Sequence, residues 1–368
     1  MIKVAYLLST LRKSGPVMVL LNIVKHQDQK LIDPVIITLS PEPENSMLQQ
    51  FTKLGIRTES LKLSRAQGIL QAGKRLGELL EKIDPDIIHS HGFRADGLAA
   101  KIRHRALKVS TLHNDPFVDY PMKFGSVKGK FMALQSRRSI KKLDLPIACS
   151  KSIQEQMDRR GIRTGCIQNG IDIELFTPIQ DHESDQLKGR LDIPLDKLIL
   201  IVSGSLIKRK DVETILHGIS QSKRNDLLLL VLGDGPEREH LVNSYGRDAR
   251  ISFLGFQENV LDYLRCADSV LSASVSEGLP NGIIESMACE LHCILSDIAS
   301  HRELNLPEGN QFFHIGDSKK LAYILDQMTV KDAMQTGKQN RDVVKRHFSA
   351  KKMARDYQTH YLKDAGEL

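Results

Sequence analysis

The sequence predicts an α/β protein with two doubly wound domains, each a parallel sheet covered by helices. Short apolar runs rich in β-branched residues alternate with longer segments of helical period, a pattern typical of βαβ units. The pattern restarts after Asn169-Gly170-Ile171-Asp172, and 368 residues are too many for one ordinary core. We therefore expect one domain over residues 1–170 and a second over residues 171–348.

The expected elements follow from these runs. Strands of the first domain are expected at Lys3–Leu8, Val35–Leu39, Asp86–His89, Val109–Leu112 and Pro146–Ala148, and helices at Met18–Gln27, Gln67–Ile83 and Arg94–His104. Strands of the second are expected at Leu198–Val202, Leu227–Leu232, Ile251–Leu254, Ser269–Ser272 and Cys293–Leu295, and helices at Val212–Ser220, Glu237–Tyr245 and Gly282–Cys289. The polar stretch Gln180–Lys188 is expected to be a linker or an exposed loop.

The end of the chain predicts one more helix. Residues Ser349–Leu362 place Met353, Tyr357 and Tyr361 four residues apart, which gives an amphipathic helix one face to bury. We expect residues 349–368 to pack back on the first domain.

Charge and cysteine content restrict the function classes. Residues 1–172 hold 28 Lys and Arg against 16 Asp and Glu, a net charge of +12, whereas residues 173–368 carry −5. The first half should therefore meet something anionic. The five cysteines include no Cys-x-x-Cys pair and predict reduced core thiols. No apolar run is long enough to span a bilayer, and no secretory leader is visible. We therefore expect a cytoplasmic protein.

Two glutamates eight residues apart carry the strongest functional signal. Glu277 and Glu285 flank Gly278-Leu279-Pro280-Asn281-Gly282, directly after one expected strand and at the start of an expected helix. The amides of Asn281 to Ile283 would then be helix N-terminal donors without intrahelical partners, which suits an anion such as a pyrophosphate. The alternative is an ordinary βα turn with a capping glutamate.

Here the sequence resembles the retaining glycosyltransferases of family 4, also called glycosyl transferases group 1, which have the two-domain GT-B fold. The family hallmark is a glutamate, seven residues and a second glutamate followed by Ala-Met-Ala, and Ser286 replaces the first of these alanines. Three further blocks occur in family order: Asn169-Gly170-Ile171-Asp172, Gly233-Asp234-Gly235-Pro236 and Phe253-Leu254-Gly255-Phe256.

The resemblance implies two Rossmann-like domains facing each other across a cleft. The first would be the acceptor side and the second would bind a nucleotide-sugar, with no metal and no other cofactor. Glu277 would orient the transferred sugar, Glu285 would bind the ribose, and His113 would lie near the sugar. Arg209 and Lys210 would neutralise the leaving pyrophosphate. The implied donor-binding residues are Gly15, Gly204, Ser205, Gly233, Phe256, Pro280, Asn281, Gly282, Ile283 and Glu285.

The basic loop departs from the family pattern. Ser205 occupies the usual arginine position, while Lys210 matches the usual lysine, so Arg209 is expected to supply the missing guanidinium. The alternative is an exposed basic loop without a ligand. A phosphate-binding Walker loop is excluded, because no Gly-x-x-x-x-Gly-Lys-Ser/Thr occurs.

Polar residues at the ends of first-domain strands complete the candidate site. His91 and Arg94 are expected near the acceptor, and His113 near the transferred sugar. We interpret His89 as a structural strand-end residue. Asp84-Pro85-Asp86 is interpreted as a turn rather than as a metal-binding Asp-x-Asp, because it precedes a strand at its amino end.

Residues 120–143 predict a membrane contact. They hold seven basic residues and no acidic one, with apolar residues interleaved, which suggests binding to anionic lipid headgroups on the inner face of the membrane. Lys128, Lys130, Arg137 and Arg138 are the candidates. The alternative is a solvated helix face, and nucleic acid is disfavoured because no binding module accompanies the charge.

The expected activity is transfer of a hexose or N-acetylhexosamine from a nucleotide-sugar, with a UDP-sugar favoured. The acceptor would be a saccharide or a lipid-linked saccharide in surface polysaccharide or lipopolysaccharide synthesis. Two alternatives share the architecture: a nucleotide-sugar isomerase of the 2-epimerase type, and a non-catalytic sugar-binding protein.

Overall fold

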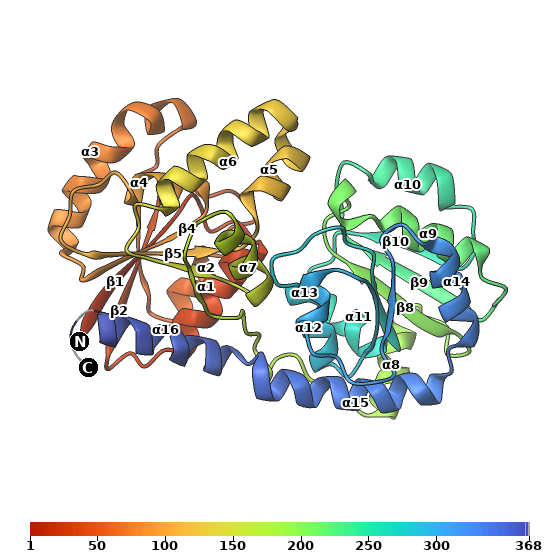
Figure 1. The fold of residues 1–368 in the computed structure, drawn as a ribbon. Helices are drawn as coiled ribbons and strands as arrows, with labels where there is room; N and C mark the ends of the chain where they lie inside the picture. The colour runs from red at the N-terminus through yellow and green to blue at the C-terminus, as the bar shows by residue number, and fades with distance from the viewer. Residues whose placement is uncertain (365, 367–368) are drawn as a thin grey trace. The chain divides into compact units, whose positions relative to one another are not determined.

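The computed structural model describes residues 1–364 and 366, and the chain forms two compact units (Figure 1). Unit 1 consists of Met1–Gly170 and Ala350–Leu368, and unit 2 of Ile171–Ser349. Of the C-terminal segment expected at 349–368, residues 365, 367 and 368 lie outside the described residues. Each unit contains one parallel sheet, as the sequence predicts.

The sheet of unit 1 has seven parallel strands in the order β3-β2-β1-β4-β5-β6-β7. The order reverses between β1 and β4, which creates a switch point where the chain leaves the carboxyl ends of two neighbouring strands in opposite directions. The strands are β1 (Ile2–Leu8), β2 (Ile32–Thr38), β3 (Arg57–Ser60), β4 (Ile87–His91), β5 (Leu107–Leu112), β6 (Leu145–Ala148) and β7 (Gly165–Cys166).

Both faces of this sheet are buried, because alternate side chains enter different cores. Along β1, Val4 and Tyr6 join one apolar cluster, whereas Ala5 and Leu7 join the other. Helices α1 (Gly15–His26) and α16 (Ala350–Asp364) lie side by side against the first face (Figure 1), and α3 (Arg65–Ile83) and α4 (Phe93–Ala99) cover the second. The remaining helices of the unit are α2 (Leu48–Lys53), α5 (Pro116–Phe124), α6 (Ser126–Ile140) and α7 (Lys151–Arg159).

The C-terminal helix α16 is part of the unit 1 core. The expected burial of Met353, Tyr357 and Tyr361 is confirmed, because none of the three is more than 1% exposed. The Tyr357 hydroxyl lies 2.7 Å from Thr111 Oγ1, and the Tyr361 hydroxyl lies 2.6 Å from His89 Nδ1. The last helix of the chain is therefore hydrogen-bonded to strands β4 and β5 of its first domain.

The sheet of unit 2 repeats the same topology with six parallel strands, in the order β10-β9-β8-β11-β12-β13. The strands are β8 (Leu198–Ser203), β9 (Leu227–Leu232), β10 (Ile251–Gly255), β11 (Ser269–Ser272), β12 (His292–Ser296) and β13 (Gln311–Phe313). The helices are α8 (Asp181–Arg190), α9 (Val212–Gln221), α10 (Arg238–Tyr245), α11 (Val260–Cys266), α12 (Asn281–Ala288), α13 (Ala299–Arg302), α14 (Ser318–Gln327) and α15 (Val330–His347).

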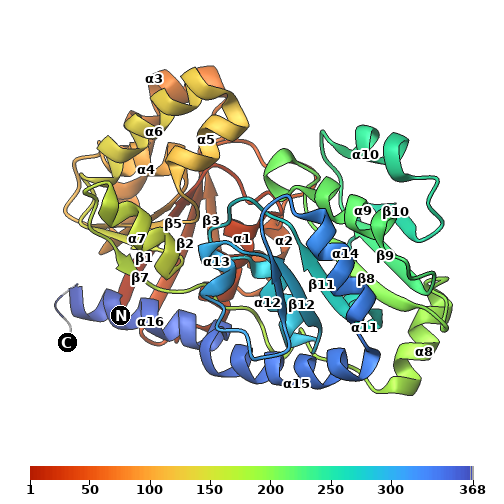
Figure 2. The same ribbon diagram turned by 45° about the vertical axis from the view of Figure 1, so that its right-hand side comes forward.

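Close backbone approach fixes one helix pair of unit 2. Helix α15 packs against α12 (Figure 2), and a Cβ built on Gly337 of α15 would lie 1.7 Å from the carbonyl oxygen of Glu290, just beyond α12. Only glycine fits such a distance.

Several expectations about local structure are wrong. Residues Gln180–Lys188 are not a loop, because α8 occupies Asp181–Arg190 and starts with a capping box between Gln180 and Glu183. The helix expected at Arg94–His104 ends at Ala99. The basic stretch 120–143 is divided between α5 and α6, because Gly125 takes a φ of +84° and breaks the helix. The short strands β3, β7 and β13 were not expected.

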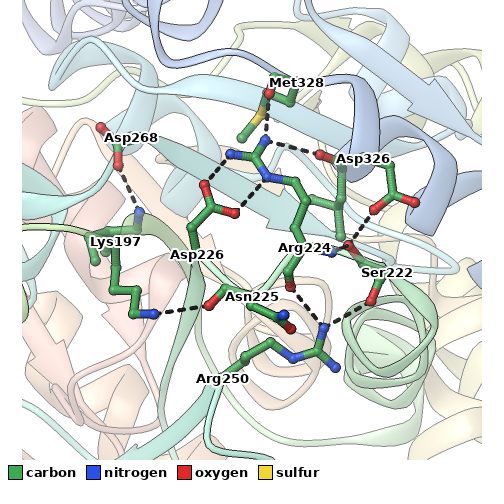
Figure 3. A network of polar contacts seen from close by, with 11 residues as sticks. Lys197, Ser222, Arg224, Asn225, Asp226, Arg250, Asp268, Asp326 and Met328 are labelled. Carbon is green, nitrogen blue, oxygen red and sulfur yellow. Dashed lines mark hydrogen bonds and ion pairs between the residues drawn. The ribbon is translucent and has the colours of Figure 1, made fainter.

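A polar network closes the amino edge of the unit 2 sheet (Figure 3). Arg250 donates to the carbonyl oxygens of Ser222 and Arg224 at 2.9 and 3.0 Å, and it forms a two-point ion pair with Asp248. Asp326, at the end of α14, accepts from the Ser222 hydroxyl at 2.6 Å. Ser222 and Arg224 lie just before β9, and Asp248 and Arg250 just before β10, at the edge opposite the strand ends where ligands bind in such sheets.

We therefore expect Arg250→Ala to reduce stability without affecting ligand binding. The guanidinium is mostly buried, and its loss leaves two carbonyls without this donor and Asp248 without its ion pair, although the amide of residue 250 still donates to Asp248. Hydrogen bonds to charged groups contribute about 1.5–3 kcal/mol, so the loss should be about 2–3 kcal/mol. Urea unfolding followed by circular dichroism measures it. A substitution of the exposed Arg247 serves as the control, and equal stability of the two variants would show that the network does not stabilise the sheet.

Candidate functional site

The second unit presents its candidate site at the carboxyl edge of the sheet. The strand order reverses between β8 and β11, so the loops that follow these two strands diverge and leave a place for a ligand. The loop after β8 carries Arg209 and Lys210, and the loop after β11 carries Glu277. The fold thus brings Glu277 next to two adjacent basic residues that precede it by almost seventy positions in the sequence.

These three side chains form one ion cluster. Lys210 Nζ lies 2.6 Å from Glu277 Oε1, and Arg209 Nη1 lies 2.8 Å from Glu277 Oε2. Arg209 Nη1 also donates to the carbonyl oxygen of Ser276. The amide of Val275 in turn donates to the Arg209 carbonyl oxygen at 2.9 Å, so backbone and side-chain bonds join the same two loops.

The cluster keeps Glu277 ionised. Burial of the carboxyl alone would raise its pKa, but the charges of Lys210 and Arg209 and their hydrogen bonds outweigh burial and lower the pKa to about 2. Two cations against one carboxylate leave a net charge of +1. The Lys210 ammonium has three N–H donors and directs one of them to Glu277, so donors remain to meet an anion.

Glycine permits the close packing of the loops that carry this cluster. Gly204 and Gly233 adopt φ values of +134° and +139°, and a Cβ on Gly233 would lie 1.8 Å from the Gly204 carbonyl oxygen. A Cβ on Gly235 would lie 2.3 Å from the carbonyl oxygen of Leu206. The Gly-Asp-Gly-Pro block therefore allows the loops after β8 and β9 to pack closely against each other. A Cβ on Gly204 would also lie 4.0 Å from Lys210 Nζ, so the ammonium lies beside this glycine.

Helix α12 begins beside these loops, but its N-terminal amides differ from the expectation. The Ile283 amide donates to the carbonyl oxygen of the N-cap residue Pro280 at 2.9 Å, so the prediction of no intrahelical partner is wrong for Ile283. The Asn281 amide donates to the Leu279 carbonyl oxygen, outside the helix, at 3.0 Å. Gly282 lies close to the end of β8, since a Cβ on it would lie 3.6 Å from Ser203 Oγ. Glu285 is the fifth residue of α12, one residue further in than expected.

A polar layer behind Glu277 was not expected from the sequence. Ser274 Oγ donates to Glu277 Oε1 at 2.7 Å, and Ser296 Oγ donates to the Ser274 carbonyl oxygen at 2.7 Å. His301 Nδ1 lies 2.8 Å from the Ser296 carbonyl oxygen, and burial lowers the pKa of His301 to about 4. Serines at strand ends are common, so only the three-dimensional neighbourhood of Glu277 reveals this layer.

The other predicted donor-binding residues occupy loop positions. Ser205 is exposed next to Gly204, and Phe256 is 60% exposed directly after β10. Gly15 is the first residue of α1 in unit 1, at the carboxyl edge of its own sheet, and its φ is not in the left-handed region.

Unit 1 contains a cavity of about 920 Å³ at the carboxyl edge of its sheet. His91 and Arg94, predicted near an acceptor, and His113, predicted near the transferred sugar, line it together with aromatic side chains. His91 Nδ1 lies 3.0 Å from His113 Nε2, and Arg94 Nη1 donates to Ser40 Oγ at 2.9 Å. The structure therefore brings these three predicted residues to one pocket.

Two structural interpretations made from the sequence are confirmed. His89 is fully buried and hydrogen-bonded through both ring nitrogens, to Tyr361 and Thr111. Asp84 ends α3 in the left-handed conformation, and the Asp86 carboxylate accepts from the amide of Lys3. Asp84-Pro85-Asp86 is thus a turn.

The α5–α6 hairpin carries the basic stretch. Lys128, Lys130 and Arg138 are exposed on α6, and the same helix exposes Val127, Phe131 and Leu134 to 84%, 67% and 50%. Arg137 differs from the expectation, because its guanidinium is turned inward and donates to the Arg160 carbonyl oxygen. No helix in the described part of the chain is long and apolar enough to cross a bilayer.

Comparison with known proteins agrees with this geometry. The family described as Glycosyltransferase Family 4 matches residues 13–175, and the one described as Glycosyl transferases group 1 matches residues 197–329. The chain is 25% identical to the O-antigen biosynthesis glycosyltransferase WclY of Escherichia coli, over 98% of both chains. It is 24% identical to an Escherichia coli UDP-Gal:alpha-D-GlcNAc-diphosphoundecaprenol alpha-1,3-galactosyltransferase, over 61% of this chain and 60% of that one.

The fold matches that of solved glycosyltransferases. Anabaena Alr3699/HepE, crystallised with UDP and glucose, superposes with a TM-score of 0.83 at 17% identity, over 99% of this chain and 100% of that one. The two family matches cover most of the chain in the expected order. The protein therefore belongs to the family 4, group 1 glycosyltransferases and is an enzyme of this class with the GT-B fold.

Proposed function

We propose that this enzyme transfers a hexose or N-acetylhexosamine from a UDP-sugar to a saccharide or lipid-linked saccharide, with retention of anomeric configuration. The observation that carries the proposal is the Glu277–Lys210–Arg209 cluster at the switch point of the unit 2 sheet. It places fixed positive charge beside a glycine loop that leaves room for phosphate. The UDP in the solved structure of HepE supports this choice of nucleotide.

The reaction proposed here needs no metal ion and no separate base. The bond between the anomeric carbon and the phosphate oxygen breaks, and the acceptor oxygen bonds to the same face of the sugar. The departing phosphate oxygen takes the proton of the acceptor hydroxyl, so UDP leaves with that proton. Lys210 and Arg209 stabilise the negative charge that grows on the diphosphate, and Glu277 orients the sugar hydroxyls.

The acceptor is proposed to bind the unit 1 cavity near His91 and Arg94, with His113 near the transferred sugar. The names of relatives support a role in assembly of a surface polysaccharide such as an O-antigen or lipopolysaccharide, and one of them names a lipid-linked acceptor. The proposed place of this assembly is the cytoplasm. The direct test incubates the enzyme and EDTA with a UDP-sugar panel and a GlcNAc-diphosphate lipid. With an α-linked sugar donor, we expect release of free UDP and formation of an α-linked product.

The same assay separates the alternatives. A rearranged nucleotide-sugar without an acceptor would indicate an isomerase, and binding without turnover would indicate a sugar-binding protein. If EDTA abolishes activity and added Mg²⁺ restores it, the proposed metal independence is contradicted.

A peripheral contact with the membrane is part of the proposal. Residues 120–143 contain no acidic residue, and α6 combines three exposed cations with three exposed apolar side chains. Phe124, next to the cations Lys123 and Lys128, extends this surface onto α5. Cations attract anionic headgroups, and exposed apolar groups enter the interface below them.

Glu277→Gln should lower the rate of transfer far more than the affinity for UDP. Glutamine keeps the shape but removes the charge that balances Lys210 and Arg209 and orients the sugar. We expect kcat to fall by about 10²–10³-fold, as for loss of a preorganised group in an active site. UDP affinity is measured by calorimetry. A parallel and equal loss of UDP affinity would place Glu277 in the nucleotide pocket instead.

Stability should respond to the same change in a pH-dependent way. Because the folded-state pKa of Glu277 is about 2, its contribution is fully present above the unfolded-state pKa and is lost only as the pH falls towards 2. The difference in unfolding free energy between wild type and Glu277→Gln should thus be constant from pH 6 to 8 and shrink below pH 4. A difference that grows on acidification would contradict the depressed pKa.

Glu285→Ala should weaken UDP binding, because the ribose diol would lose a charged acceptor. The expected loss is about 1.5–3 kcal/mol, the range for hydrogen bonds to charged groups. Calorimetry with UDP measures it, and Glu239→Ala, at an exposed position of α10, is the matched control. Unchanged affinity in a folded Glu285→Ala protein would remove Glu285 from the ribose site.

Changing Lys128, Lys130 and Arg138 together to Gln should release the protein from anionic vesicles. Each cation near an anionic leaflet contributes about 1 kcal/mol, so the partition coefficient should fall by roughly 10²–10³-fold. Co-sedimentation with phosphatidylglycerol vesicles at low salt is the measurement, and wild type should release at high salt. The control removes the same charge from other exposed positions of unit 1: Lys53, Lys82 and Lys101. Equal release by both triple variants would show that only net charge acts.

A further inference from the structure

Three histidine rings form a column at the carboxyl end of β4 and β5. The ring centroids of His89 and His91 are 4.4 Å apart with an interplanar angle of 30°, and those of His91 and His113 are 5.3 Å apart at 26°. The column runs from the buried core to the cavity, because His89 is 0% exposed while His91 and His113 line the cavity.

The inner end of the column is fixed by the C-terminal helix. His89 Nδ1 lies 2.6 Å from the Tyr361 hydroxyl, and His89 Nε2 lies 2.8 Å from Thr111 Oγ1. Thr111 Oγ1 is also 2.7 Å from the Tyr357 hydroxyl. Both nitrogens of His89 are therefore used, and the ring against which His91 stacks cannot rotate freely.

One hydrogen bond joins the two outer rings of the column, those of His91 and His113. His91 Nδ1 and His113 Nε2 are 3.0 Å apart, so one nitrogen must donate and the other must accept. Burial lowers the pKa of His113 to about 4 and that of His91 well below its usual value, so both rings are neutral at pH 7. Each ring then carries a single N–H, and the direction of this one bond fixes both tautomers.

The environment of His91 Nε2 selects the direction. This atom is buried and has no hydrogen-bond partner among the described residues. If His113 donated, His91 would carry its proton on Nε2 and bury an N–H without an acceptor. If His91 donates from Nδ1, Nε2 holds only a lone pair. Orphaned buried N–H groups are rarer than orphaned acceptors, which favours the second arrangement.

We propose that His91 is a positioning residue that donates its Nδ1–H to His113 Nε2, so that His113 carries its own proton on Nδ1 and presents this N–H to a ligand oxygen in the cavity. His113 Nδ1 makes no hydrogen bond within the described residues, which leaves it available. A sugar hydroxyl or ring oxygen can accept this bond. That the ligand is a sugar rests on the proposed function, whereas the proton position does not.

A matched pair of variants tests the proton position. Asn at position 91 can donate an amide N–H in place of Nδ1–H, whereas an ionised Asp can only accept. In ¹⁵N-histidine NMR at pH 7.5, wild type and His91→Asn should show His113 protonated on Nδ1 alone. In His91→Asp the proton should be on Nε2. The His113 signals are assigned by their loss in His113→Gln, and thermal unfolding checks that each variant folds.

The wild-type spectrum decides even if the Asp variant fails to fold, since a proton on His113 Nε2 in wild type overturns the proposal. The same tautomer in folded Asn and Asp variants would also overturn it. In the transfer assay, His91→Asp should lose at least tenfold more kcat than His91→Asn, because the Asn variant keeps a donor to His113. If wild type transfers no sugar but shows the Nδ1–H tautomer, the proposed function fails and the proton position stands.

Discussion

A buried carboxylate is stable as an anion only where cations and hydrogen bonds replace the water it has lost. Glu277 meets this condition through Lys210, Arg209 and Ser274. Its partners lie in the loops after β8 and β11, so the cluster fixes two loops at the switch point of the unit 2 sheet. The approach of the loop before Lys210 to the loop after β9 depends on Gly233 and Gly235, where no side chain would fit. The glycine block and the charged residues thus serve one arrangement.

The opposite edge of the same sheet shows a different use of charge. There the side chains of Arg224 and Arg250 donate to backbone carbonyl oxygens, and Asp326 accepts from a serine hydroxyl (Figure 3). Such a closed network leaves little capacity for a ligand, whereas the cluster at the carboxyl edge has one cation more than it has carboxylates. The two edges therefore differ in whether their donors are used up by the protein. In unit 1, Tyr357 and Tyr361 of helix α16 likewise use their hydroxyls on partners within the protein.

The sequence predicted most of the fold because alternate faces of parallel strands are both apolar and so form continuous runs, as in β1 and β9. The edge strand β3, with Arg57 and Glu59, lacks such a run and was missed. Helix α8 was missed because its residues are polar and its capping box, rather than apolar period, starts it. The candidate site was predicted as a set of residues through the family motifs. The pairing of Arg209 with Glu277 and the layer of Ser296 and His301 could not be predicted, since they depend on contacts between distant loops.

The two units also differ in the charge they offer the proposed reaction, and this difference has a physical reason. Negative charge grows on the departing diphosphate, so permanent cations such as Lys210 and Arg209 lower the barrier there. Positive charge grows at the anomeric carbon of a glycosyl group during transfer. A protonated histidine near that carbon would oppose the reaction. Burial lowers the pKa of His113 to about 4, so the ring can donate a hydrogen bond at neutral pH without adding charge. In the proposed reaction, a neutral donor at His113 and fixed cations at Lys210 and Arg209 would therefore meet the same electrostatic requirement.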